Sequence, residues 1–170
     1  MSTLKTLSNN THVYRIEVFL KPHLTDTSGL ALYTFLKNVG LHGLEEVRSS
    51  RLYEITGNLS LHQIHQTAKE ILSDPITQDY ALISETSTHS GEKRNNWKIR
   101  TCLRDFLADP IGESVCSAMS ELGLPVPQRV RCATVYTVLG RVYQTQLEKA
   151  ARPFFAESIL KEVSLLEAAA

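Results

Sequence analysis

The sequence predicts an α+β protein built from two similar units, each with the element order strand, helix, strand, strand, helix, strand (βαββαβ). Three observations predict it: the chain matches itself, its expected strands alternate, and its expected helices carry apolar stripes. When the sequence is shifted by 83 positions, it matches itself without a gap. The shift places Asp26, Gly29, Gly40, Leu41, Val47, Arg48, Tyr53, Gly57, Ala68, Ile76 and Leu82 on Asp109, Gly112, Gly123, Leu124, Val130, Arg131, Tyr136, Gly140, Ala151, Ile159 and Leu165. Two copies in one chain can supply what a homodimer supplies by association.

In the first unit, residues 13–20 alternate with a period of two, which indicates a strand. Asp26 is the expected N-cap of a helix, and Gly40 is the expected residue that stops it. The other expected elements are strands at residues 46–48 and 51–57, a second helix ending before Pro75, and a strand at residues 80–83. The helical stripes expected in the core are Leu32, Phe35, Leu36 and Val39, then Ile64, Ala68, Ile71 and Leu72.

The second unit repeats this order. Trp97, Ile99 and Thr101 line its first expected strand, and Asp109 caps a helix with Pro110 at the favoured first position. Tyr136 and Val138 share one face of a later strand. Pro153, which aligns with Glu70, is expected to kink or shorten the last helix near its C-terminal end. The stripes of the two helices are Val115, Ala118, Met119 and Leu122, then Leu147, Ala151, Phe154 and Phe155.

The expected boundaries follow from the repeat and from a polar stretch between its copies. Residues 12–84 form the first unit, residues 85–96 a polar linker without apolar side chains, and residues 97–167 the second unit. The βαββαβ order implies a ferredoxin-like antiparallel sheet with both helices on one face. Glu17 aligns with Arg100, so we expect the two sheets to associate, by face or by edge, into a pseudo-dimer. The alternative is a free sheet edge kept for a partner chain.

Composition and charge narrow the function classes. The chain has 170 residues, of which 42% are hydrophobic, as in an ordinary soluble globular protein. Lys plus Arg equals Asp plus Glu at 18 each, which argues against a nucleic-acid partner. Residues 1–85 carry 7 basic and 9 acidic side chains, and residues 86–170 carry 11 and 9. The start lacks an apolar signal segment and no stretch could cross a bilayer, so we expect a cytoplasmic protein without a membrane partner.

The familiar signatures of catalysis are missing from the sequence. It contains no GxxxxGK[ST], GxGxxG, HExxH or GxSxG motif. His62 and His65 are spaced to share a metal, but no third ligand is nearby and Glu148 replaces His65 in the repeat, so two solvent-facing histidines are expected. The three cysteines, Cys102, Cys116 and Cys132, are expected to be neutral packing thiols. We therefore expect no catalytic residue, no metal site and no activity of the chain alone.

Three ordered motif blocks resemble a known family. They are Phe19-Leu20-Lys21-Pro22 with Asp26 and Gly29, then Glu46-Val47-Arg48 with Arg51 and Glu54, then residues 72–80 (LSDPITQDY). These blocks are similar to the LKPxVLDPQG, VxxVRxGKxxE and LLxNPVIExY patterns of PurS, the small subunit of phosphoribosylformylglycinamidine synthase. Ser50 stands where the family has Gly, and Thr27-Ser28 where it has Pro-Gln. The second unit resembles a diverged PurS copy, with Thr134, Thr137 and Ser158 at positions where the family has Lys or Arg, Glu and Pro.

The resemblance implies an assembly subunit of a glutamine-dependent ligase in purine biosynthesis. The family's enzyme makes the amidine from formylglycinamide ribonucleotide, ATP and glutamine. Chemistry belongs to a synthetase subunit, with its ATP and Mg, and to a glutaminase subunit, so no cofactor is expected here. PurS-like subunits lie between those two and support ammonia delivery. A PurS-like pseudo-dimer within one chain is expected, and the sequence leaves open whether the units pair within a chain or between chains of a homo-oligomer.

The residues expected at partner interfaces form a charged and aromatic set. They are Lys21, Arg48, Arg51, Tyr53, Glu54, Arg131 and Tyr136. Because both repeats keep Arg48 and Arg131, the alternative is that these two brace the strand hairpin. Two other functions share the βαββαβ order. An ACT-like regulatory tandem domain would bind a small molecule at the loop after the first strand, where no glycine precedes Gly29. An RNA-recognition module would need an aromatic platform and a basic face.

Overall fold

The computed structural model describes residues 11–83, 96–156 and 161–167. The expected linker, residues 85–96, lies outside them except for Asn96. The first half contains β1 (His12–Leu20), α1 (Thr27–Asn38), β2 (Leu44–Gly57), α2 (Leu61–Thr67), a π-helical turn (Ala68–Leu72) and β3 (Gln78–Ile83). The second contains β4 (Asn96–Leu103), α3 (Pro110–Glu121), β5 (Arg129–Gly140), α4 (Gln144–Phe155) and β6 (Lys161–Glu167).

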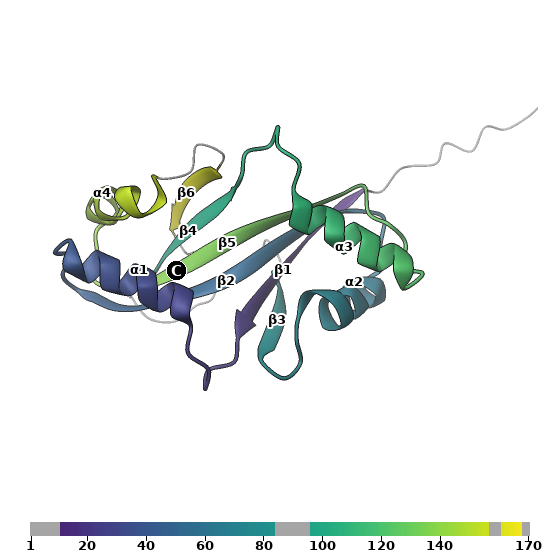
Figure 1. The fold of residues 1–170 in the computed structure, drawn as a ribbon, viewed down its shortest axis with the longest axis horizontal. Helices are drawn as coiled ribbons and strands as arrows, with labels where there is room; N and C mark the ends of the chain where they lie inside the picture. Colours follow the sequence, from purple (N-terminus) through teal and green to yellow (C-terminus); the bar gives the residue numbers. More distant parts are fainter. Residues whose placement is uncertain (1–10, 84–95, 157–160, 168–170) are drawn as a thin grey trace, which may run out of the picture.

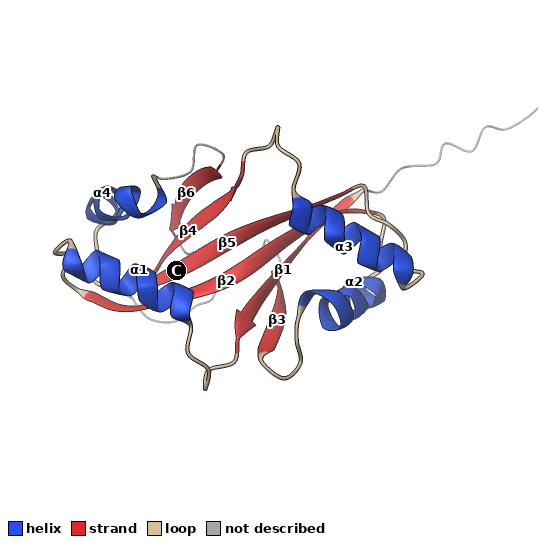
Figure 2. Cartoon of the chain, in the orientation of Figure 1, coloured by secondary structure: helices blue, strands red, loops and turns tan. Residues whose placement is uncertain are grey.

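Within the described residues, the six strands form one antiparallel sheet in the order β3-β1-β2-β5-β4-β6 (Figure 1). The helices lie over one face of this sheet (Figure 2). The architecture confirms the α+β class and is consistent with two ferredoxin-like units. No helix in the described part of the chain is long and apolar enough to span a membrane.

The prediction of two short strands at residues 46–48 and 51–57 was wrong in detail, because β2 is a single strand. Its last eight residues, 50–57, pair with β1, and residues 44–56 pair with β5 with one register shift between Leu44 and Glu46. Ser49 and Ser50, where a break was expected, are neither Gly nor Pro and have partners on β5. The second ladder therefore keeps the backbone extended across that point.

The helix ends follow the capping residues. The Asp26 carboxylate accepts the Gly29 N–H at 2.9 Å and starts α1. Gly40, at φ 86°, ends the helix with its N–H bonded to the Lys37 carbonyl. Asp109 and Pro110 start α3 as expected. Pro153 lies inside α4, which ends two residues later at Phe155.

Strands β2 and β5 join the two halves at the centre of the sheet. Arg51 lies opposite Thr134, the residue 83 positions later in the chain. The pairs on either side, such as Val47 with Val138 and Ile55 with Val130, are then related by exchanging the halves. This is the register that a two-fold relation between two similar units requires.

Neither hydrophobic core belongs to one half. One core combines Ile16, Ile55 and Ile64 of the first half with Val115 and Met119 of α3. The other combines Leu32 and Leu36 of α1 with Trp97, Val138 and Leu147 of the second half. In Figure 1, α1 accordingly lies with α4 at one end of the sheet, and α3 lies with α2 at the other. Each first helix packs on the central strand of its own half and also contributes to a core shared with residues of the other half.

Candidate partner-binding site

Two aspartates attach the first helix of each half to the central strands. Besides capping α1, Asp26 accepts hydrogen bonds from the backbone N–H and the hydroxyl of Ser49 on β2, the latter at 2.7 Å. Asp109 accepts from Ile111 and Gly112 at 3.1 Å and from the Cys132 N–H on β5 at 2.6 Å. Since Cys132 aligns with Ser49, both halves use the same device. Its role is structural.

The helices approach the strands closely because a glycine stands at each contact. A Cβ on Gly29 would lie 2.6 Å from the Val47 carbonyl oxygen. A Cβ on Gly112 would overlap the Val130 carbonyl oxygen. The two glycines and the two valines are among the positions that match when the sequence is shifted by 83. Part of the internal match is therefore explained by the packing of each helix on its strand.

Arg131 braces the loop between β4 and α3. Its guanidinium donates to the carbonyl of Leu107 at 3.0 Å and to that of Leu103, and lies 3.5 Å from the Asp105 carboxylate. Only 12% of the side chain is exposed. For this arginine the geometry supports the bracing alternative, although the brace holds a loop rather than a hairpin.

Arg48, which aligns with Arg131, behaves differently. Its Nε donates to the Glu46 carboxylate at 2.7 Å, and 61% of the side chain is exposed. Leu20 and Leu24, which align with Leu103 and Leu107, line an open pocket, because Arg48 binds Glu46 instead of this loop. Arginine therefore fills the loop after the first strand in the second half, whereas the corresponding loop of the first half stays open.

This pocket, the β1–α1 pocket, has a volume of about 470 Å³. Its walls are the loop after β1, one side of α1 and residues 45–50 of β2. Phe19, Leu24 and Leu30 supply apolar surface, and Glu17, Glu45 and Glu46 supply carboxylates. Two cations also line it, but Lys21 donates to the Pro75 carbonyl at 2.6 Å and Arg48 is paired with Glu46.

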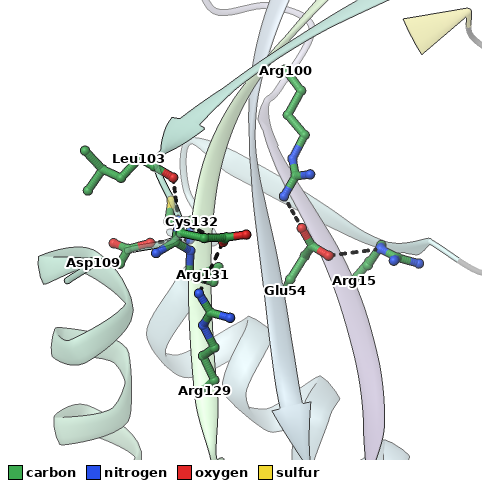
Figure 3. A network of polar contacts seen from close by, with 9 residues as sticks. Arg15, Glu54, Arg100, Leu103, Asp109, Arg129, Arg131 and Cys132 are labelled. Carbon is green, nitrogen blue, oxygen red and sulfur yellow. Dashed lines mark hydrogen bonds and ion pairs between the residues drawn. The ribbon is translucent and has the colours of Figure 1, made fainter. Parts of the chain in front are cut away.

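On the sheet face away from the helices, charged residues of the two halves form cross-strand pairs. Glu54 on β2 binds Arg15 of β1, at 3.3 Å, and Arg100 of β4 (Figure 3). Glu17 on β1 accepts from Lys98 of β4 at 3.3 Å and from the Ser50 hydroxyl at 2.6 Å. We call these residues the open-face ion network. Since each carboxylate of one half meets a cation of the other, the network helps to hold the halves in register.

The aromatic candidates lie on the helix-covered face. Tyr53 is 5% exposed, and burial is the main cause that raises its pKa, while a hydrogen bond with Arg51 lowers it. Burial, and then the nearby Asp26 carboxylate, raise the pKa of Tyr136. Arg51 itself is exposed at the centre of this face. Both tyrosines are therefore neutral at physiological pH and pack between helix and sheet.

The thiols and the helix histidines show nothing that points to chemistry. Burial raises the pKa of all three cysteines, and that of Cys132 to about 11 with a further contribution from Asp109. His62 and His65 are exposed, and His65 lies 3.3 Å from the Tyr80 hydroxyl. Among the residues that the structure describes, no three His, Cys, Asp or Glu side chains are grouped to hold a metal.

The residues expected at partner interfaces do not form one surface. Lys21 and Arg48 lie at the β1–α1 pocket, Arg51 with Tyr53 and Tyr136 on the helix-covered face, and Glu54 and Arg131 on the open face. The alternation of a continuous β2 separates Arg48 and Glu54 from Arg51 and Tyr53. Sequence reasoning did not select Arg15 and Lys98 as site residues, although Arg15 shares a face of β1 with Glu17, and Lys98 shares a face of β4 with Arg100.

Comparison with known proteins gives a family match for the first half of the chain. Residues 13–85 match the PurS family model, described as phosphoribosylformylglycinamidine (FGAM) synthase. The first half of the chain is therefore similar to PurS. The match supports a part in FGAM synthase, and so in purine biosynthesis, in association with other subunits of that enzyme. Among curated proteins none matches the chain. A solved structure of an unknown protein from Galdieria sulphuraria is 14% identical, over 93% of this chain and 99% of that one, with a TM-score of 0.21.

Proposed function

We propose that this PurS-like chain is a non-catalytic assembly subunit of FGAM synthase, which bridges the ATP-using synthetase subunit and the glutaminase subunit. The observation that carries the proposal is the PurS match over β1 to β3. The cofactors ATP and Mg then belong to the synthetase subunit. Ammonia transfer between two enzymes requires that their sites be held in a fixed relation, which a rigid bridging subunit can provide.

The second half is a diverged copy of the first in this proposal, and the two form an internal pseudo-dimer. Three findings support it: the gap-free self-match at a shift of 83 positions, the pairing of Arg51 with Thr134, and the two cores that both halves share. Divergence then frees the two ends of the pseudo-dimer to differ. In the first half the loop after the first strand lines the open β1–α1 pocket, and in the second half the corresponding loop is filled by Arg131. Such a pseudo-dimer can contact two unlike partners with two unlike ends.

Reconstitution tests the proposal. The synthetase and glutaminase subunits are assayed for FGAM formation with and without this chain, using either glutamine or ammonium as the nitrogen source. We expect glutamine-dependent formation to require the chain, whereas ammonium-dependent formation, which needs no ammonia delivery, proceeds without it. Glutamine-dependent activity that is unchanged when the chain is withheld would contradict the proposal.

A second function, regulatory binding of a small molecule as in ACT-like tandem domains, is favoured by one observation. The β1–α1 pocket is lined by the loop where such domains would bind a ligand, and its volume of about 470 Å³ is that of an ordinary ligand site. A ligand that binds only the folded chain raises its melting temperature. Amino acids and nucleotides at millimolar concentration that leave the melting temperature unchanged would exclude this function for those ligands.

A further inference from the structure

The two halves of the chain hold the loop after their first strand in different ways. In the second half, the Arg131 guanidinium binds the carbonyls of Leu103 and Leu107 and lies within 3.5 Å of Asp105. In the first half, the aligned residues Leu20 and Leu24 line the β1–α1 pocket. The guanidinium is thus present in one loop and missing from the other.

The neighbours of the two arginines explain the difference. On β2, Glu46 precedes Arg48 by two residues on the same strand face and binds it at 2.7 Å, which turns the guanidinium outward. On β5 the aligned neighbour is Arg129, a like charge that favours no such pair. The loop of the second half offers Asp105, 3.2 Å from Arg129 and 3.5 Å from Arg131. Pro22 stands at that position in the first half and offers no charge.

The β1–α1 pocket suits a long cationic side chain. Apolar Phe19, Leu24 and Leu30 can pack on methylene groups, and the carboxylates of Glu17, Glu45 and Glu46 favour a positive head group. Because Glu17 is paired with Lys98 and Glu46 with Arg48, the surplus negative charge comes from Glu45 and Asp26, which outnumber Lys21 by one. A guanidinium adds a planar set of donors that can bind two carbonyls at once, as Arg131 does in the other loop.

We propose that the β1–α1 pocket receives an arginine side chain from a partner protein. The inserted guanidinium takes the place in the first half that Arg131 occupies in the second, and binds the loop carbonyls and the nearby carboxylates. The proposal goes beyond assembly of FGAM synthase, because it names the chemistry of one contact and holds whichever protein supplies the arginine.

A titration followed by backbone amide NMR tests the proposal on the full chain. The probes are the tripeptides Gly-Arg-Gly, Gly-citrulline-Gly and Gly-Lys-Gly, together with free L-arginine. Citrulline keeps the shape of arginine without its charge, and lysine keeps the charge without the planar donors. We expect Gly-Arg-Gly to shift the amides of residues 20–25 in a saturable manner, at least fivefold more tightly than the other tripeptides. The amides of residues 103–108, whose loop Arg131 fills, should not move.

Three variants make the test specific. Glu46→Arg puts an arginine two residues before Arg48, as Arg129 stands two residues before Arg131. The Arg48 guanidinium should then turn into the loop and occupy the pocket, which would abolish Gly-Arg-Gly binding. The matched control is Glu121→Arg, the same change of charge at an exposed position of α3, which should leave binding unchanged. Arg131→Ala, if folded, should let the probe shift residues 103–108 as well.

The opposite results would overturn the proposal. Equal binding of the citrulline or lysine tripeptide would show that no guanidinium site exists. No shift of residues 20–25 at 50 mM Gly-Arg-Gly would show that the pocket takes no arginine. Tighter binding of free L-arginine than of the tripeptide would assign the pocket to a small molecule instead of a partner protein. None of these measurements requires FGAM synthase subunits, so they can fail or succeed independently of the proposed function.

Discussion

At the scale of single residues, identical amino acids have different surroundings in the two halves. Arg131 is largely buried and binds two loop carbonyls, whereas Arg48 is exposed and binds one neighbouring carboxylate. The energetic weight of an arginine depends on these surroundings, because exposed ion pairs contribute little and a buried charged donor contributes much more. Identity between repeats therefore does not imply equal roles.

This difference predicts unequal costs for the same substitution. Arg131→Ala should lower the free energy of unfolding by about 2–3 kcal/mol, since it leaves the carbonyls of Leu103 and Leu107 without a charged donor. Arg48→Ala should change it by less than about 0.5 kcal/mol. Urea denaturation followed by circular dichroism measures both. Equal losses would mean that the loop carbonyls find other partners, such as water.

The buried thiol and phenols predict a loss of stability in alkali. The pKa of Cys132 is about 11 in the folded chain against 9.0 for an ordinary thiol, and burial raises the pKa values of Tyr53 and Tyr136 too. The folded state then keeps protons that the unfolded state releases, so the contribution of these groups to stability is fully present below about pH 9 and is lost as the pH rises from about 9 to 11. The melting temperature between pH 8 and 10.5 measures this. Cys132→Ala should reduce the slope, and an unchanged slope would contradict the assignment to this thiol.

At the scale of elements, the close contact of each first helix with a central strand depends on glycine. Gly112 of α3 lies against the Val130 carbonyl, and its Cβ position is occupied by that oxygen. The Asp109 carboxylate then reaches both the helix start and the Cys132 N–H. Helix and strand are held together at one point by sterics and hydrogen bonds.

Gly112→Ala is expected to push α3 away from β5. The cost should be about 1–3 kcal/mol, as for other overpacked contacts, even though alanine favours helices elsewhere. Ser114→Ala, two residues along the same helix at an exposed position, is the matched control and should cost less than about 0.5 kcal/mol. Thermal unfolding of both variants provides the comparison, and a stabilised Gly112→Ala would show that the helix can shift freely.

Local sequence signals located the elements, but they could not reveal partners distant in the chain. Asp26, Asp109 and Gly40 set helix ends through bonds within a few residues, and these were predicted. The continuity of β2 depends on β5, and the two shared cores place α1 and α3 beside residues of the other half, which no local pattern contains. The open β1–α1 pocket, in contrast, could have been predicted from the sequence. The replacements of Arg129 and Asp105 by Glu46 and Pro22 are visible in the 83-residue alignment.

At the scale of the whole molecule, the two halves are one structural unit. The central β2–β5 ladder, the mixed cores and the open-face ion network all join residues of the first half to residues of the second. Neither half retains a complete core when the other is removed. A chain of this size whose halves share their cores is expected to unfold in one cooperative transition.

Separated halves should therefore fold only together. Residues 1–85 alone would have to pair two copies of β2, which places Arg51 opposite Arg51 instead of Thr134 and puts Glu17 at the position from which Arg100 binds Glu54. We expect each half alone to give the poorly dispersed NMR spectrum of an unfolded chain, and an equimolar mixture to give the spectrum of the full protein. As a control, a protease site inserted after residue 88 and cut in the folded protein should leave that spectrum intact. A folded monomer of either half would show that one half can complete a core by itself, contrary to the two shared cores observed here.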